Sequence, residues 1–425
     1  MADGDGILDD LAARGLVQDH TDEVALREEL GAGPLTLYHG IDPSASSLHV
    51  GNLVGVLALR RFQDAGHRPI ALVGGATGMI GDPGGRSEER NLLDRETLAE
   101  NLAGIGRQLG RLLSTSGDNA VTMVNNHDWT RDLTVLDFLR DVGKHVTVNQ
   151  MVAKESVRSR MEGEHGISYT EFSYMLLQAF DYWWLHENHG CRLQIGGSDQ
   201  WGNITAGVDL IRRRSQAGVH GLTWPLITKS DGTKFGKTAD GAVWLDATRT
   251  LPYEFHQHFL RSDDRDVERF LLQLTLLPVD EIVEHMAVHR DHPERRHAQR
   301  VLADAVTALI HGDDAVADAN LAASTLFGEV DVTAAGLEAL RGVVPESELS
   351  ADALLADLSE VLVRCGLASS KSDARRTLAE DGFRANGVKL TGRDTLGPQD
   401  LVGGRFVLLQ RGKKNRHLVV VTDGG

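Results

Sequence analysis

Residues 38–52, with the sequence YHGIDPSASSLHVGN, place polar groups where a β-rich run ends and a helical pattern begins near Val50. Unpaired N–H groups and the positive dipole end make a helix N-terminus a favourable place for phosphate. His49 and Asn52 lie one helical turn apart and add side-chain donors on the same face. The segment indicates an anion-binding turn, although a histidine at a helix start is more often a cap or a surface residue.

A second segment, residues 74–86, is rich in glycine and also follows a predicted strand. Its glycines permit close approach of the backbone to a ligand, while Asp82 can accept a hydrogen bond from an ammonium group and Arg86 can bind a phosphate or carboxylate. The segment matches neither the dinucleotide-binding pattern nor the P-loop pattern. A turn-rich loop without a ligand is an equally good interpretation of these residues alone.

A third segment, residues 231–238, reads DGTKFGKT and ends like a P-loop. The first glycine that a P-loop requires is replaced by Asp231, and no strand-to-helix context surrounds the segment. We therefore predict a mobile loop whose Lys234 and Lys237 close over a leaving pyrophosphate. Lysines in such a loop are also often simply solvated.

The helix predicted around residues 171–187 carries Tyr174, Gln178 and Asp181 at positions i, i+4 and i+7. This spacing puts three polar groups on one face of an otherwise apolar helix, which indicates a ligand pocket or an exposed polar stripe. Residues 196–203, GGSDQWGN, form another turn with polar groups at a helix start.

His285 and His289 have the i, i+4 spacing of some metal sites, but no glutamate lies between them as in zinc proteases. We interpret both as part of a solvated helix face and predict no protein-bound metal.

Short β-rich runs alternate with amphipathic helical stretches over the first half of the chain, and this alternation positions the polar segments. The alternation predicts an α/β fold with a mostly parallel, doubly wound sheet and ligand sites beyond the carboxyl ends of its strands. Strands are predicted at 35–41, 70–73, 121–124 and 192–195, and helices at 50–65, 95–113, 133–142, 150–161, 171–187 and 204–213. Residues 252–277 and 293–311 are helical in pattern, whereas 312–318 and 328–348 look like a connector.

Composition narrows the class of protein. The chain has 425 residues and a net charge of −17, with 41% hydrophobic and 25% charged residues, which excludes disordered and fibrous classes. Cys191 and Cys365 are too few for a disulfide scaffold or a cysteine-rich zinc site, so we expect reduced thiols and a cytoplasmic protein. The acidic N-terminus resembles no targeting peptide, and no apolar run is long enough to span a membrane.

Charge is distributed unevenly along the chain. Residues 351–425 contain twelve basic and nine acidic residues, so this part is basic although the whole is acidic. Between Gly403 and Val421 lie five basic and no acidic residues, including Lys413, Lys414 and Arg416. We predict that this segment contacts nucleic-acid phosphates, the alternative being a solubilising surface hairpin.

Taken together and in this order, the segments resemble those of bacterial tyrosyl-tRNA synthetases, which are class I aminoacyl-tRNA synthetases. Residues 38–52 resemble the first signature of that class, which usually ends in HIGH, and KFGKT at 234–238 corresponds to the second signature, KMSKS. LVGGATGMIGDP, EFSYMLLQAFD and LQIGGSDQWGNITAG are also similar to family segments. The resemblance covers nearly the whole chain.

The resemblance implies a tyrosine–tRNA ligase that forms tyrosyl-adenylate from tyrosine and ATP with Mg²⁺ and then transfers tyrosine to the 3′ end of tRNA(Tyr). It implies that Tyr38 and Asp181 bind the phenolic hydroxyl, that Tyr174, Gln178 and Asp82 bind the ammonium group, and that Gln200 binds the carboxylate. Gly40, Asp42, His49, Gly51, Asp199 and Lys237 are expected at the ATP site. The residues expected to stabilise the reacting phosphates are His49, Asn52, Lys234, Lys237, Thr238, Arg86 and Arg90.

The resemblance also implies a homodimer, with residues 138–152 in its interface, and tRNA contacts at Lys413, Lys414, Arg416, Arg212 and Arg213. The domains it implies are a Rossmann-like catalytic domain (1–222), the loop of the second signature (223–250), an α-helical anticodon-binding domain (251–330), a linker (331–350) and an α+β RNA-binding domain of the S-four type (351–425). No membrane contact is expected.

The chain departs from the family pattern at three positions. Asn52 replaces the last histidine of HIGH, His39 stands where relatives often have cysteine, and Gly55 stands where some have threonine. We assign no role to His39 or Gly55. Two other functions remain as alternatives: a P-loop-type nucleotide hydrolase, and a noncatalytic RNA-binding protein built on a synthetase scaffold.

Overall fold

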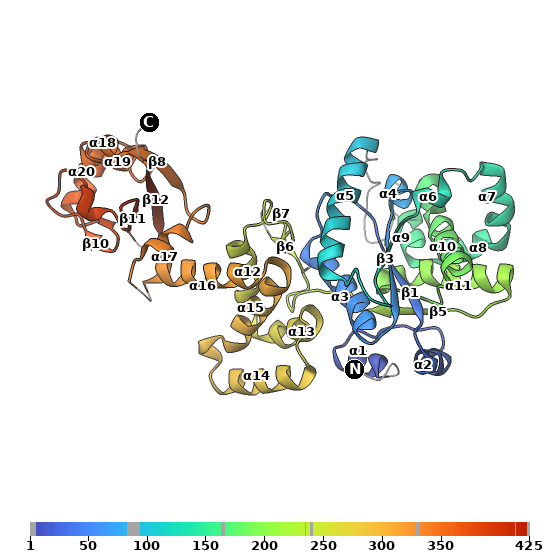
Figure 1. Cartoon of the computed structure of the whole chain (residues 1–425). Coiled ribbons are helices and arrows are strands. Elements are labelled where there is room, and N and C mark those ends of the chain that lie inside the picture. Colours follow the sequence, from blue (N-terminus) through green and yellow to red (C-terminus); the bar gives the residue numbers. More distant parts are fainter. Residues whose placement is uncertain are drawn as a thin grey trace. The chain divides into compact units, whose positions relative to one another are not determined.

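The computed structural model describes residues 6–82, 94–162, 166–233, 235–238, 241–328, 331–412 and 414–422 (Figure 1). Two compact units are present. The first comprises residues 1–246 and 261–305, and the second comprises residues 247–260 and 306–425.

A five-stranded parallel sheet forms the centre of the first unit, with the strand order β3-β2-β1-β4-β5. Its strands are β1 (Thr36–Ile41), β2 (Arg68–Val73), β3 (Thr122–Asn125), β4 (Leu193–Gly197) and β5 (His220–Trp224). In register, Tyr38 of the central strand lies opposite Ile70 on one side and Gln194 on the other. β4 and β5 are buried along their whole length, as strands of a covered parallel sheet are.

Helices cover both faces of this sheet. The connection from β1 to β2 runs through α3 (Val50–Asp64), and the connection from β4 to β5 runs in the opposite direction through α11 (Trp201–Ser215). Both crossover connections are right-handed. Because they run in opposite directions along the sheet, α3 and α11 lie on opposite faces of the sheet. Figure 1 shows α3 and α5 (Arg95–Leu112) on one side of the sheet, and α11 with α10 (Tyr169–His189) on the other. The strand order reverses between β1 and β4, where ligands bind in folds of this kind.

The other helices of the first unit surround this frame. They are α1 (Ile7–Ala13), α2 (Glu23–Ala32), α4 (Thr77–Ile80), α6 (His127–Thr130), α7 (Val135–Asp141), α8 (Val148–Ala153), α9 (Glu155–Glu162), α13 (Asp264–Leu274) and α14 (Val279–Asp291). A two-stranded ribbon, β6 (Lys237–Thr238) with β7 (Gly241–Ala242), lies in the segment of the second signature. α15 (His297–His311) continues from the first unit into the second.

The second unit contains a mixed five-stranded sheet with the order β10-β9-β11-β12-β8. Its strands are β8 (Glu346–Ser350), β9 (Phe383–Ala385), β10 (Val388–Lys389), β11 (Phe406–Arg411) and β12 (Asn415–Thr422). Its helices are α12 (Pro252–Leu260), α16 (Asp313–Phe327), α17 (Ala334–Glu338), α18 (Ala351–Leu354), α19 (Leu358–Arg364) and α20 (Lys371–Ala379). The sheet is covered on both faces. The side chains of one face form a core with α18 to α20, and those of the other face form a core with α16 and α17.

The structure confirms the predicted fold class and changes several predicted elements. The helix predicted at 252–277 is two helices, because the Asp263 side chain accepts a hydrogen bond from the Arg265 N–H and starts α13 anew. The acidic stretch 312–318, interpreted as connector, consists of the N-cap Gly312 and the first half of α16. β8 lies in the predicted linker and pairs in parallel with β12. In the described part of the chain, no helix is long and apolar enough to cross a membrane.

Candidate active site

A cavity of about 340 Å³ opens beyond the carboxyl ends of β1 and β4, at the point where the strand order reverses. It is bounded by the start of α3 and by the polar face of α10. Many residues that the sequence singled out line this one cavity: Tyr38, Gly40, Asp42, His49, Gly51, Asn52, Asp82, Tyr174, Gln178, Asp181, Asp199 and Gln200. The fold thus brings together side chains separated by more than a hundred residues in the sequence.

Asp181 is a buried carboxylate held by two donors. The indole N–H of Trp129 donates to Oδ1 at 2.8 Å, and the Asn126 amide donates to Oδ2 at 2.9 Å. Burial raises the pKa of Asp181 to about 7, although both hydrogen bonds oppose this shift by favouring the ionised form. A carboxylate has about four acceptor positions, so two remain for a ligand.

Tyr38 lies beside Asp181, and its hydroxyl is buried without a hydrogen-bond partner among the described residues. Burial, and next the negative charge of Asp181, raise the pKa of Tyr38 well above its usual range. Tyr182, whose ring centroid lies 5.3 Å from that of Tyr38, is equally buried but donates to the His220 carbonyl at 2.7 Å. Because an unpaired buried hydroxyl is costly, the Tyr38 hydroxyl is a group left for a ligand.

Asp42, at the end of β1, connects the two sides of the cavity. Its Oδ1 accepts from the Thr77 hydroxyl at 2.7 Å, and its Oδ2 accepts from the Tyr174 hydroxyl at 2.9 Å. Tyr174 is therefore oriented by Asp42, whose carboxylate lines the cavity. This arrangement suits a ligand that brings positive charge or N–H donors.

Asp82 and Gln200 form a second polar cluster at the cavity. The Gln200 amide donates to Asp82 Oδ2 at 2.6 Å, and the Asn203 amide donates to Gln200 Oε1 at 2.9 Å. Lys154 in turn donates from Nζ to Asn203 Oδ1 at 2.5 Å. The cluster is pre-ordered by its own hydrogen bonds, so a ligand that binds there loses little side-chain entropy.

The start of α3 is fixed by a reciprocal cap between His49 and Asn52. The Gly51 N–H donates to His49 Nδ1 at 3.0 Å, while the His49 N–H donates to Asn52 Oδ1 at 3.0 Å. A neutral His49 that accepts at Nδ1 carries its proton on Nε2, and Asn52 that accepts at Oδ1 keeps its amide nitrogen as a donor. His49 is thus a helix cap and also lines the cavity, so the two interpretations made from the sequence are compatible.

The unassigned residues His39 and Gly55 lie together at the cavity wall. A Cβ atom at position 55 would be 2.3 Å from His39 Nε2, so the imidazole needs a glycine there. His39 Nδ1 lies 3.2 Å from the Ile195 carbonyl, and burial lowers its pKa to about 4. The imidazole is therefore neutral at pH 7, donates to that carbonyl and keeps Nε2 as an acceptor.

Sequence reasoning assigned no role to several polar residues of the site. Thr77 and Gln194 line the cavity, while Asn126 and Trp129 support Asp181 from the end of β3 and from α6. Thr77 and Gln194 do lie in segments that were singled out, the glycine-rich segment and LQIGGSDQWGNITAG, whereas Asn126 and Trp129 do not.

The remaining predicted residues around the phosphates lie partly beyond what the structure describes. Arg86, Arg90 and Lys234 are outside the described residues. Lys237 and Thr238 form β6, of which only the backbone is described. Next to them, Gly236 approaches α3 so closely that a Cβ would lie 2.6 Å from Val50 Cγ2. The second signature is therefore next to the first.

The predicted tRNA contacts fall on two surfaces. Lys414 is exposed at the turn between β11 and β12, whereas the guanidinium of Arg416 donates to the Leu326 carbonyl within the second unit. In α11, Arg212 pairs with Asp209 at 2.7 Å, and Arg213 donates to the His145 carbonyl. Lys413 is outside the described residues.

The prediction of a solvated histidine face on α14 was wrong for His289. This side chain is 3% exposed and lies 3.3 Å from Asp264 Oδ1, because α14 turns it toward α13. His285 Nδ1 lies 3.1 Å from His297 Nε2. Among the residues that the structure describes, no group of three or more metal-ligating side chains occurs.

Comparison with known proteins gives concordant matches over nearly the whole chain. Residues 31–328 match the family described as class I tRNA synthetases (W and Y), and residues 337–419 match the C-terminal domain of SYY-like tyrosine–tRNA ligases. The tyrosine–tRNA ligase of Opitutus terrae is 51% identical over 98% of this chain and 99% of its own length. That of Streptomyces griseus is 49% identical over 99% of both chains.

Solved structures agree with these matches. A C-terminally truncated mitochondrial tyrosyl-tRNA synthetase from Aspergillus nidulans aligns with a TM-score of 0.68 and 33% identity, covering 76% of this chain and 94% of that one. The Archaeoglobus fulgidus tyrosyl-tRNA synthetase complexed with L-tyrosine has a TM-score of 0.55 at 17% identity, covers 72% of this chain and 98% of that one, and shares the fold.

Proposed function

This chain belongs to the tyrosine–tRNA ligase family of class I aminoacyl-tRNA synthetases, and from this premise we propose how its residues carry out that reaction. The enzyme joins tyrosine to tRNA with ATP as a substrate. The single observation that carries the residue assignment is the buried hydroxyl of Tyr38, which has no hydrogen-bond partner in the described part of the chain and lies beside the Asp181 carboxylate.

Tyr38 and Asp181 recognise the phenolic hydroxyl of the substrate. The Tyr38 O–H donates to the phenolic oxygen, and the phenolic O–H donates to an oxygen of Asp181 that Trp129 and Asn126 hold in place. Phenylalanine brings no hydroxyl, so both buried groups stay unpaired when it binds. Tyrosine-specific synthetases are the standard example of such discrimination.

The other end of tyrosine is placed at the opposite polar clusters. Tyr174, Gln178 and Asp82 hold the ammonium group, and Gln200 binds the carboxylate. Tyr174 is oriented by Asp42, and Gln200 by Asp82 and Asn203. The substrate carboxylate then points toward the start of α3, where the α-phosphate of ATP is expected.

ATP binds along the ends of β1 and β4 and over the start of α3. The glycines Gly40 and Gly51 allow the nucleotide to approach the backbone, Asp199 binds the ribose, and the helix N-terminus favours the phosphates. The residues proposed to line the ATP site are Gly40, Asp42, His49, Gly51, Asp199 and Lys237. The Mg²⁺ that accompanies ATP would supply charge neutralisation of the phosphates, and its ligands would be chiefly phosphate oxygens rather than side chains.

The reaction has two steps. A carboxylate oxygen of tyrosine attacks the α-phosphorus, the bond to the bridging oxygen breaks, and pyrophosphate leaves. The terminal ribose hydroxyl of tRNA then attacks the carbonyl carbon of the adenylate, and AMP leaves. Neither step requires a protein nucleophile, so catalysis depends on positioning and charge stabilisation by His49, Asn52, Lys234, Lys237, Thr238, Arg86 and Arg90.

The domains keep the roles that the resemblance implies. We propose a catalytic domain over 1–222, the second-signature loop over 223–250, a helical anticodon-binding domain over 251–330, a linker over 331–350 and an RNA-binding domain over 351–425. Lys413, Lys414 and Arg416 are proposed to contact the tRNA backbone, with Arg212 and Arg213 near its acceptor end.

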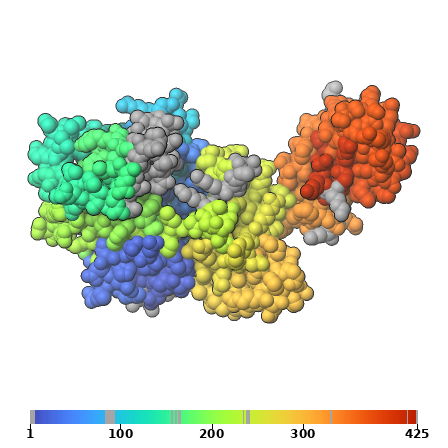
Figure 2. All heavy atoms as spheres, turned by 180° about the vertical axis from the view of Figure 1, so that it is seen from behind, coloured from blue at the N-terminus to red at the C-terminus, as the bar shows by residue number. Residues whose placement is uncertain are grey.

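A homodimer is supported by an apolar surface on α7 and at the start of α8. Val135, Leu136, Leu139 and Val148 are 74%, 78%, 47% and 62% exposed, and large exposed apolar side chains in one segment mark an interface. This segment is the teal edge of the first unit in Figure 2. We also propose a cytoplasmic location, because both cysteines are free and buried.

The test is tyrosine-dependent exchange of labelled pyrophosphate into ATP, with phenylalanine as the control amino acid. We expect exchange with tyrosine and none above background with phenylalanine at equal concentration. ATP hydrolysis without tyrosine would instead support a nucleotide hydrolase, and RNA binding without exchange would support a noncatalytic protein.

A further inference from the structure

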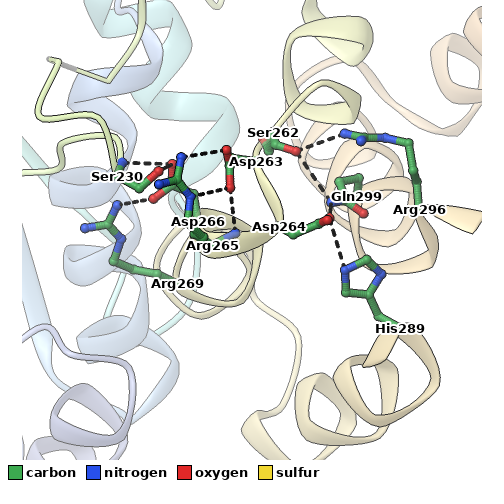
Figure 3. A network of polar contacts seen from close by, with 10 residues as sticks. All are labelled: Ser230, Ser262, Asp263, Asp264, Arg265, Asp266, Arg269, His289, Arg296 and Gln299. Carbon is green, nitrogen blue, oxygen red and sulfur yellow. Dashed lines mark hydrogen bonds and ion pairs between the residues drawn. The ribbon is translucent and has the colours of Figure 1, made fainter. Parts of the chain in front are cut away.

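Helix α13 binds the segment that leads into the second signature through a polar contact at Asp266. The Asp266 carboxylate is 3% exposed, and its Oδ2 accepts from both the N–H and the hydroxyl of Ser230, at 3.0 and 3.1 Å. Arg269 donates to Asp266 Oδ1 at 2.8 Å and to the Thr228 carbonyl (Figure 3). Two residues of α13 therefore fix the backbone of the segment at positions 228 and 230.

An apolar contact adds a third attachment of the same segment. Phe235 is 7% exposed, and its ring centroid lies 4.5 Å from that of Phe270. Asp266, Arg269 and Phe270 are at positions i, i+3 and i+4 of α13, so they lie on one face of the helix. This face holds the segment before and after position 234, and the segment continues directly into Lys237.

α13 is itself fixed to α3, the helix that begins at the first signature. The buried guanidinium of Arg61 donates to the carbonyls of Leu272 and Thr275 at the end of α13, at 3.3 and 2.5 Å. The N–H of Val50 donates to the Val243 carbonyl, and the N–H of Val243 donates to the Gly236 carbonyl, at 3.0 Å each. α13 and the start of α3 thus form one frame to which both signatures are bonded.

From these contacts we propose that Asp266 is a positioning residue for adenylate formation, which sets where the second-signature lysines lie relative to the ATP phosphates. Asp266 is not among the described residues that line the cavity; it acts through Ser230 and, by way of Arg269, through the backbone at Thr228. Since small displacements of a charge-stabilising group strongly reduce transition-state stabilisation, loss of this attachment lowers the rate of activation without changing the tyrosine pocket. The inference rests on the proposed role of Lys237 in that step.

The chain offers a matched control in Asp264. Both aspartates lie in the first turn of α13 and interact alike with its dipole. Because they are two residues apart, their side chains leave the helix about 160° apart, on nearly opposite faces. Asp264 faces Gln299 and His289 rather than Ser230 (Figure 3). A general loss of helix stability affects both variants, whereas mispositioning of the second signature affects Asp266→Ala alone.

The experiment measures tyrosine-dependent pyrophosphate exchange and tyrosine affinity for full-length Asp266→Ala, Asp266→Asn and Asp264→Ala. We expect Asp266→Ala to lower kcat about tenfold with an unchanged Kd for tyrosine, Asp266→Asn to recover part of the loss, and Asp264→Ala to stay close to the wild-type chain. Ser230 is exposed, so Ser230→Ala removes one of the two contacts without threatening the fold, and we expect a smaller loss in the same direction.

A double-mutant cycle with Lys237→Ala tests the route of the effect. If Asp266 acts by placing the second signature, Asp266→Ala causes little further loss once Lys237 is absent. Additive losses, equal losses in Asp266→Ala and Asp264→Ala, or a weakened tyrosine Kd in Asp266→Ala would each overturn the proposal. Absence of exchange in the wild-type chain would instead refute the proposed function, so the two failures are distinguishable.

Discussion

The cavity beyond β1 and β4 and the hairpin of β11 and β12 both present polar side chains, but in different surroundings. In the cavity, Asp181, Asp82 and Tyr38 are buried, and other side chains hold the two carboxylates in place. On the hairpin, Lys414 is exposed at the turn. Electrostatic interactions and hydrogen bonds are stronger in a buried site and are screened by salt at a surface. We therefore expect the cavity to discriminate by single groups and the hairpin to act through summed charge.

The largest effect should come from removing the second region altogether. We expect deletion of residues 331–425 to abolish tRNA charging, while tyrosine-dependent pyrophosphate exchange per active site stays within about twofold, because phosphate contacts are lost but the cavity is not touched. The deletion exposes the apolar side chains Ala322 and Leu326 of α16, which lowers the fraction of folded protein. The exchange rate should therefore be divided by the concentration of active sites, measured by titration. Full tRNA charging by the truncated chain would refute the proposal that residues 331–425 bind tRNA while the cavity activates tyrosine.

Within the cavity, loss of one buried group should have the next largest effect. We expect Asp181→Ala to weaken tyrosine binding about a hundredfold, because it removes a charged acceptor, and Tyr38→Phe about tenfold, because it removes a neutral donor. Both should reduce the preference for tyrosine over phenylalanine in the exchange assay. An unchanged preference in either variant would show that the hydroxyl is recognised elsewhere.

The titration of Asp181 should have a smaller effect on tyrosine binding, and it tests whether this single buried group governs recognition in the cavity. Its pKa is raised to about 7, so the empty site is largely protonated at pH 6 and ionised at pH 8. The ionised form is the stronger acceptor for a phenolic O–H, so we expect the Kd for tyrosine to fall several-fold from pH 6 to pH 8. Asp181→Asn should make this profile flat. A profile that keeps its slope in Asp181→Asn would assign the titration to another group.

The same pKa shift predicts a cost in stability. The folded-state pKa lies above the unfolded value of about 3.9, so protonation favours the folded state, and this contribution is lost as the pH rises from about 4 to about 7. In Asp181→Asn one of the two acceptor oxygens becomes an amide donor facing Trp129 or Asn126, a cost that is the same at every pH. We therefore expect the change in thermal unfolding midpoint caused by Asp181→Asn to be more favourable by a few degrees at pH 8 than at pH 5. An equal shift at both pH values would mean that ionisation of Asp181 does not limit stability.

How far the sequence predicted the site depended on whether the signal was local. Tyr174, Gln178 and Asp181 were found because the helical period places them on one face, and His49 because it lies where a helix begins after a strand. Asp42 was assigned only through the family resemblance. Asn126 and Trp129 have no such pattern, since only the parallel pairing of β3 and the packing of α6 bring them to Asp181. Asp266 likewise reaches Ser230 only through tertiary structure.

The distinction between local and tertiary signals also explains which elements of the fold were predicted. The alternation of strands and helices predicted the parallel sheet, but β5 was missed because it is a short, fully buried run next to a proline. The first half of α16 was interpreted as connector because its acidic first turn and its alanines give a weak apolar face, although the acidic residues favour a helix N-terminus. β8 is polar and is specified by its pairing with β12 rather than by its own pattern.

The smallest effect is expected for a single exposed charge on the hairpin. Lys414→Ala should weaken tRNA binding about threefold and reduce the salt dependence of binding by about one phosphate contact, without changing pyrophosphate exchange. Lys389→Ala is a matched control on the same sheet, because Lys389 pairs with Asp381 at 2.7 Å and its charge is already balanced. Binding should be measured from low to physiological salt, where screening of an exposed contact is visible. Equal losses in the two variants would mean that the whole basic surface, rather than the β11–β12 turn, contacts the tRNA.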